Sequence, residues 1–177
     1  MKYSIYIVLI SIILFSCTKK EKDFDSFEYS YCGTFSTFFS IKFKQNDTIF
    51  LREHWNSGGN KDIKFPKSER NYFALLTEKQ KQELSNLLSK INFRKINSEY
   101  FEDYNDGSAF QIIFRKGNFK KKVLVHSYHI PRELDSLSHW IYKTKMKLKL
   151  NEISQKLEFE SAKELFPPPP PPLPVMK

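Results

Sequence analysis

The sequence has 177 residues, with 29 lysines and arginines against 20 aspartates and glutamates, and a formal charge of +9. This length suits one domain, and two cysteines are too few for a disulfide-rich scaffold or a four-cysteine zinc site. Hydrophobic residues make up 40% and aromatic residues 16%, so we expect a packed core, whereas five glycines leave little room for a glycine-rich phosphate loop.

The N-terminal residues have the layout of a secretion signal. Lys2 precedes an apolar stretch, residues 5–15, that only Tyr6 and Ser11 interrupt. This stretch is too short to cross a hydrocarbon core of ~30 Å as a helix at ~1.5 Å per residue. Its length is that of the apolar region of a signal peptide, so we expect residues 1–16 to be removed.

The apolar stretch ends at Leu14-Phe15-Ser16-Cys17, which resembles a bacterial lipobox. The resemblance implies cleavage before Cys17, diacylation of the Cys17 thiol and acylation of the new amine. Acyl chains contribute ~0.8 kcal/mol per buried CH₂, so two or three of them hold a soluble domain on a membrane. An ordinary signal peptide with a chance cysteine, or an uncleaved anchor, is the alternative interpretation.

The residues after Cys17 bear on where the lipoprotein would reside. Thr18 stands where some bacteria have the aspartate that retains lipoproteins at the inner membrane, so we expect the outer membrane. Residues 17–27 form a charged tether, whose Lys/acidic run loosely resembles a surface-export signal. The periplasmic and the outer face therefore both stay open.

Apolar and polar residues alternate in four segments, which predicts strands at 35–43, 48–55, 110–114 and 121–128. A helix is expected from Thr77, because Gln80 completes a capping box. Its apolar stripe consists of Leu84, Leu87, Leu88 and Ile91. A second helix is expected after Pro131, with Leu134, Leu137, Ile141 and Leu148 at helical spacing. Between the two, residues 92–108 are a long connection.

This order of elements, β-β-α-β-β-α, predicts an α+β domain at 28–150 with an antiparallel four-stranded sheet and two packed helices. Residues 151–166 are polar and are expected to form a stalk outside the domain. Residues 167–177 begin with six prolines and are expected to form a stiff polyproline II tail.

The layout resembles small bacterial lipoprotein domains of unknown function, over about residues 28–148. In one such family a Cys-aromatic-Gly-x-Cys-Pro run opens the first hairpin, and a Pro-x-x-Leu helix closes the domain. Residues 31–36 (Tyr-Cys-Gly-Thr-Phe-Ser) and 131–134 (Pro-Arg-Glu-Leu) stand at comparable places. Both family cysteines are replaced here, by Tyr31 and Phe35, and the resemblance implies no known activity.

The proline tail contains a candidate ligand for a partner domain. Phe-Pro-Pro-Pro-Pro resembles the ligand of EVH1 domains, and the Pro-Pro-Leu-Pro that follows resembles SH3 or profilin ligands. The candidate partner-binding residues are Phe166, Pro167, Pro168, Pro169 and Pro170. The alternative interpretation is a rigid spacer.

Side chains that could support catalysis are scattered and carry no motif. Candidates for an envelope enzyme are His126, His129 and the acids of residues 99–106 (Glu99, Glu102, Asp103 and Asp106). The two histidines are poorly placed to share a metal, because residues i and i+3 of a strand point to opposite faces. Cys32 is expected to be buried; pairing with another chain and catalysis are the alternatives.

We therefore expect a non-enzymatic lipoprotein of the outer membrane that serves as a binding or structural module, without a metal or other cofactor. Its basic charge lies in residues 17–150. In the envelope such a surface meets lipid head groups, an envelope protein or an anionic polymer rather than nucleic acid. A solvated lysine-rich surface is the simpler explanation of that charge.

Overall fold

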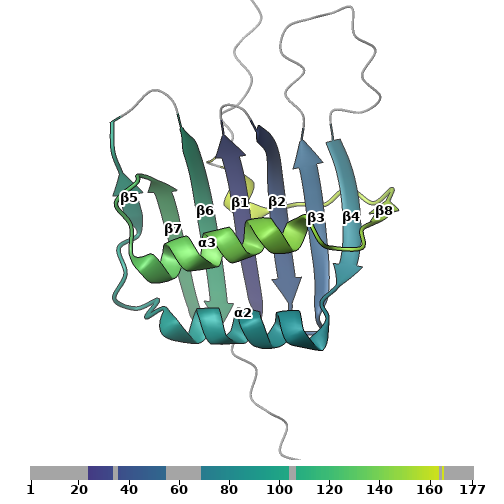
Figure 1. The fold of residues 1–177 in the computed structure, drawn as a ribbon, viewed down its shortest axis with the longest axis horizontal. Helices are drawn as coiled ribbons and strands as arrows, with labels where there is room; N and C mark the ends of the chain where they lie inside the picture. The colour runs from purple at the N-terminus through teal and green to yellow at the C-terminus, as the bar shows by residue number, and fades with distance from the viewer. Residues whose placement is uncertain (1–23, 34–35, 55–68, 104–106, 164, 166–177) are drawn as a thin grey trace, which may run out of the picture.

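The computed structural model describes residues 24–33, 36–54, 69–103, 107–163 and 165. Within these ranges it contains one eight-stranded sheet and two α-helices, α2 and α3, which both lie on the same face of the sheet (Figure 1). The strands are β1 (Ser26–Gly33), β2 (Ser36–Lys44), β3 (Thr48–His54), β4 (Glu69–Leu75), β5 (Glu99–Phe101), β6 (Ser108–Lys116), β7 (Phe119–His126) and β8 (Asn151–Ile153). The helices are α2 (Glu78–Lys90) and α3 (Arg132–Lys145).

The strands are ordered β5-β7-β6-β1-β2-β3-β4-β8. Neighbouring strands are antiparallel except β5 and β7, which pair in parallel. Side chains of successive strand residues point to opposite faces, so each central strand contributes every second residue to the face beneath the helices. The fully buried side chains on that face include Phe27, Tyr29, Phe39, Ile41, Phe43, Ile49, Leu51, Ile112 and Val123.

Both predicted helices form, but α3 ends at Lys145, so Leu148, which the sequence placed in the second helix, lies beyond its end. Thr77 and Gln80 make the reciprocal capping box of α2, and Leu84 and Leu88 are buried against the sheet. Pro131 precedes α3, whose apolar stripe of Leu134, Leu137 and Ile141 is fully buried. Figure 1 shows α3 across the middle of the sheet and α2 across the end where β1 begins.

The expected four-stranded antiparallel sheet is wrong, although the general α+β class is consistent with the structure. The four predicted strands correspond to β2, β3, β6 and β7, but four more strands join them. β1 is the central addition, because it pairs with both β2 and β6 and places Phe27, Tyr29 and Tyr31 over the core. The expected connection at 92–108 contains β5, which pairs with β7.

Residues 151–163 and Leu165 belong to the packed structure, whereas the sequence predicted a stalk at 151–166. β8 pairs with β4, and the chain then crosses the sheet face opposite the helices (Figure 1). We call residues 154–163 together with Leu165 the C-terminal strap. Leu157, Phe159 and Ala162 form a second apolar cluster with Phe50, which explains why this segment is held to the sheet.

Phe159→Ala tests whether the C-terminal strap contributes to stability. The Phe159 ring is 3% exposed and lies beneath the cations of Lys42 and Arg52. Removing it should lower the free energy of unfolding by about 3 kcal/mol, measured by urea denaturation. Lys156→Ala, at an exposed strap residue, is the control and should change it by less than about 0.5 kcal/mol. Equal stability of the two variants would mean that the strap is a detached stalk.

Candidate functional site

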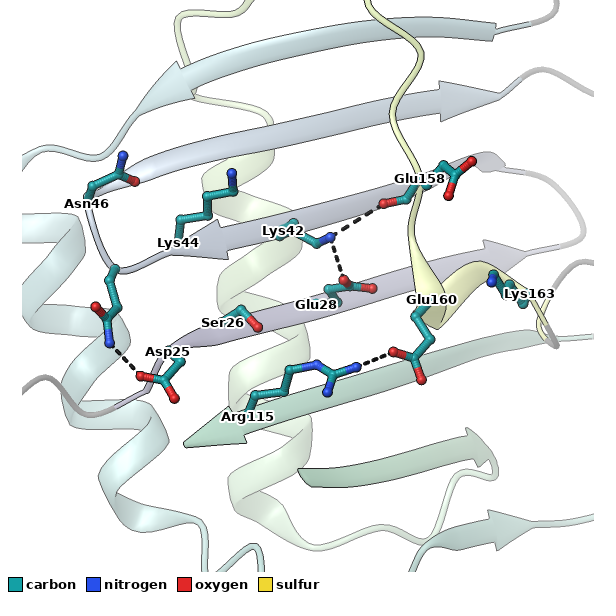
Figure 2. A pocket seen from close by; sticks show the side chains of 11 residues that line it. Asp25, Ser26, Glu28, Lys42, Lys44, Asn46, Arg115, Glu158, Glu160 and Lys163 are labelled. Atoms are coloured by element: carbon teal, nitrogen blue, oxygen red, sulfur yellow. Dashed lines mark hydrogen bonds and ion pairs between the residues drawn. The ribbon is translucent and has the colours of Figure 1, made fainter. Parts of the chain in front are cut away.

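Two clefts lie on opposite faces of the sheet, and their chemistry differs. The first, which we call the polar cleft, has a volume of about 610 Å³ and lies between the C-terminal strap and strands β1, β2 and β6 (Figure 2). Its charged lining consists of four acids, Asp25, Glu28, Glu158 and Glu160, and four bases, Lys42, Lys44, Arg115 and Lys163. The lining is therefore balanced in formal charge.

Glu28 is the most deeply buried charge of the polar cleft, with 5% exposure. Its carboxylate pairs with Lys42 Nζ at 2.7 Å and accepts the backbone N–H of Ser161 at 3.1 Å. Lys42 Nζ also donates to the Glu158 carbonyl at 3.4 Å. Sheet and strap thus share one network, and Figure 2 shows the contacts of Lys42 with Glu28 and Glu158.

Hydroxyl groups continue this network into the sheet. The Ser30 hydroxyl bonds to the hydroxyls of Ser40 and Ser161, each at 2.7 Å, and all three residues are fully buried. At the edge of the cleft, Glu160 pairs with both Arg115 and Lys120. The hydrogen bond from Lys120, with the charges of Lys120 and Arg115, holds the pKa of Glu160 below its usual range.

These contacts give the polar cleft a structural role. The carboxylates of Glu28 and Glu160 are engaged in attaching the strap, and Arg52 donates to the Leu157 carbonyl at 2.9 Å for the same purpose. A general acid, base or nucleophile has to reach a substrate, and Glu28, 5% exposed beneath the strap, does so only if the strap leaves.

The second cleft lies on the helix face, between α3 and the ends of β1, β6 and β7, and has a volume of about 370 Å³. We call it the tyrosine cleft. Its apolar lining comes from Tyr29, Tyr31, Phe110, Tyr128, Ile130 and Tyr142. Its polar lining comes from Ser108, Ser127, Ser138, Asp135, His139 and Lys143.

The tyrosine cleft has a rigid floor and an accessible rim. Tyr29 is fully buried, stacks on Phe110 at 5.4 Å between ring centroids, and shares a 2.7 Å hydrogen bond with the Ser138 hydroxyl. Burial raises the pKa of Tyr29 well above its ordinary value, so its hydroxyl stays protonated. At the rim, Tyr128 is 73% and Tyr142 43% exposed.

Two contacts fix the rim residues of the tyrosine cleft. Tyr142 packs edge-on against Tyr31 at 6.0 Å, and the backbone N–H of Tyr128 donates to Glu102 at 2.7 Å. On α3, Asp135 and His139 pair at 3.2 Å. Asp135 and Lys143 offset each other in formal charge, so the cleft is neutral on a strongly basic chain.

The structure brings together two of the side chains that the sequence suggested for catalysis. His129 Nδ1 bonds to the Glu102 carboxylate, and this bond holds the pKa of Glu102 below its usual range. The His129 side chain is 88% exposed, and neither residue lines the polar or the tyrosine cleft. His126 lies beside Phe101, with 5.4 Å between ring centroids. Within the described ranges, no group of three or more His, Cys, Asp or Glu residues could hold a metal ion.

The remaining predicted residues give little further evidence for a site. Glu99 and Asp103 are exposed, and Asp106 lies outside the described residues. Cys32 is a free, half-buried cysteine rather than a fully buried one. Burial raises the pKa of the Cys32 thiol, which disfavours the reactive thiolate. Cys17, Phe166 and Pro167 to Pro170 lie outside the described residues.

Sequence reasoning missed the tyrosine cleft entirely. Tyr29 and Tyr31 alternate along β1, and Ser138 and Tyr142 are one turn apart on α3, so each pattern signals one face of its element. Nothing local relates the two faces, because they are more than 100 residues apart in the chain.

No protein-family model matches the chain, and no curated protein is similar to it in sequence. The resemblance of residues 28–148 to small lipoprotein domains therefore stays a prediction. Among the described residues, no helix has the length and hydropathy needed to cross a bilayer.

The Glu160 ion pairs should make stability depend on pH in acid. The pKa of Glu160 is lower in the folded state than its ordinary value of 4.5, so the ionised carboxylate stabilises the fold above pH 4.5. This stabilisation is lost as the pH falls through the folded-state pKa. Urea midpoints of the wild type should therefore drop more between pH 7 and pH 3 than those of Glu160→Gln. Glu99→Gln, at an exposed carboxylate on β5, should keep the wild-type profile. A Glu160→Gln profile as steep as that of the wild type would show that the Glu160 ion pairs do not attach the strap to the sheet.

Proposed function

We propose that this chain is a lipid-anchored lipoprotein of the outer membrane whose domain is a binding module rather than an enzyme. The lipobox at residues 14–17 supports the anchor. The tyrosine cleft supports the binding role, since ligand sites are typically concave, mostly apolar and furnished with a few convergent polar groups. A cofactor and a metal are not part of the proposal.

The neutral lining of the tyrosine cleft supports a neutral ligand. Exposed tyrosine rings offer apolar faces, and tyrosine, serine and histidine offer hydrogen-bonding groups beside them. A sugar ring has matching surfaces, because its C–H groups form an apolar face and its hydroxyls form a polar rim. We therefore assign a neutral glycan of the envelope to this cleft.

The single observation that carries the proposal is the exposure of Tyr128 and Tyr142 around a preformed floor. Exposed aromatic rings cost free energy in water, and their gathering at one cleft marks an interaction site. At the floor, the hydrogen bond between the hydroxyls of Tyr29 and Ser138 fixes the orientation of α3 against β1. The cleft therefore exists before any ligand arrives.

Titration with a soluble, neutral N-acetylglucosamine oligosaccharide tests the binding function. Tyr128→Ala and Tyr142→Ala should each weaken binding by roughly tenfold or more, measured by calorimetry, because each removes one aromatic face at the rim. Phe101→Ala is the matched control, since Phe101 is 63% exposed and lies outside the cleft. Absence of binding by the wild type, or binding that neither tyrosine variant changes, would contradict the glycan assignment.

A further inference from the structure

The described chain begins at one end of the sheet, where Asp25 ties it to the β6–β7 turn. Asp25 precedes β1, and its backbone N–H donates to the Arg115 carbonyl at 2.8 Å, beside the β6–β7 turn. The Asp25 carboxylate accepts the Gly117 backbone N–H at 2.7 Å and the Gln45 side-chain amide at 2.6 Å. The N-terminal entry point is thereby fixed to this turn.

A third cleft, of about 920 Å³, lies between this turn and the C-terminal end of α2. Its charged lining is Lys90, Arg94 and Lys116 against the single acid Asp25, whose carboxylate is already hydrogen-bonded on both oxygens. Lys95 adds a further exposed cation next to Arg94. We call Lys90, Arg94, Lys95 and Lys116 the basic edge.

The basic edge differs from the other two clefts in its ratio of basic to acidic residues. The polar cleft has as many acids as bases in its lining, and the tyrosine cleft is neutral. The lining of this third cleft has three bases and one acid. An excess of exposed cations in a concave surface concentrates anions there.

The short distance to the proposed lipid anchor favours lipid head groups as the anionic partner. Phe24 is seven residue steps from Cys17, and a fully extended chain spans at most ~3.6 Å per step, so the start of the described chain lies within about 25 Å of the acylated residue. Anionic head groups attract lysine and arginine side chains only within about a Debye length of the surface, ~8–10 Å. A tether of this length lets the domain rest on the membrane with its N-terminal end.

We propose that the basic edge docks on the anionic head groups of the membrane to which Cys17 anchors the chain. This inference rests on the proposed lipid anchor, but the surface chemistry can be measured without it. The contact would add to the acyl chains and would set the orientation of the domain, with the α2 C-terminus and the β6–β7 turn toward the lipid.

The test uses the chain from Thr18 to Lys177, which retains every described residue and lacks the acylated cysteine. Sedimentation with vesicles should show binding to phosphatidylcholine containing about one third phosphatidylglycerol, and none to phosphatidylcholine alone. Raising the salt to about 1 M, where the Debye length is ~3 Å, should release the protein. Binding to both vesicle types alike would overturn the proposal.

Charge reversal locates the surface. A triple variant, Lys90→Glu, Lys95→Glu and Lys116→Glu, should lose affinity for anionic vesicles by roughly tenfold or more. Arg94 is left in place because its guanidinium stacks on Phe119 at 4.7 Å. The matched control reverses Lys147, Lys149 and Lys156, which are also exposed and lie near β8 in the chain. This control changes the net charge by the same amount as the basic-edge variant, and it should bind anionic vesicles as the wild type does.

The other possible results of the vesicle experiments also distinguish membrane docking from its alternatives. Equal loss in both triple variants would show a general charge effect and overturn the docking surface. Binding to a soluble anionic polysaccharide but not to vesicles would replace the membrane with an envelope polymer. Thermal melts verify that each variant folds, and a Lys→Gln version of the basic-edge triple should lose part of the affinity. Failure of Cys17 acylation would leave vesicle binding unchanged, so the two proposals fail separately.

Discussion

The carboxylate of Glu28 lies in the middle of the sheet, and the arrangement of the polar face depends on it. A buried charge costs several kcal/mol unless it is paired and hydrogen-bonded. Lys42 supplies the countercharge from the neighbouring strand, and the backbone N–H of Ser161 supplies the hydrogen bond from the C-terminal strap. The strap must therefore lie across this face, where the Ser30 hydroxyl and the Phe159 ring hold it further. The helices close the other face mainly with apolar contacts, beside which lie the Tyr29–Ser138 hydrogen bond and the Lys145–Glu53 ion pair. The two faces of one sheet are thus completed by different balances of polar and apolar contacts.

The domain also has two chemically different ends. β6 begins with Ser108 at the tyrosine cleft and ends with Lys116 at the basic edge. At ~3.3 Å per residue this nine-residue strand separates the two sites by roughly 25 Å. In the proposed account the basic edge faces the membrane and the tyrosine cleft faces away from it, so the lipid anchor holds the ligand site at a set height above the head groups. The two proposals thus use different side chains of the same rigid sheet.

Local sequence patterns predicted the elements that are apolar on one face and polar on the other. β2, β3, β6, β7 and both helices are of this kind. β1 was missed although Phe27, Tyr29 and Tyr31 alternate with polar residues, which is a strand pattern. What this pattern does not contain is the central place of β1 between β2 and β6 and the burial of Glu28 and Ser30 beneath the strap. β5 and β8 have three residues each, too few for any period. The strap appears polar because Glu158 and Glu160 separate its buried apolar residues, and the tyrosine cleft joins segments that no local pattern relates. Long-range contacts therefore account for what the sequence did not predict.

The account depends most on Cys17, because the proposed anchor would place the domain in the envelope and bring the basic edge to a membrane. The most direct measurement is the intact mass of the protein purified from membranes, together with that of Cys17→Ala. The account predicts a chain that begins at an acylated Cys17, and a variant that is soluble or unprocessed. A chain that still begins at Met1, or one that is cut without gaining lipid, would contradict it.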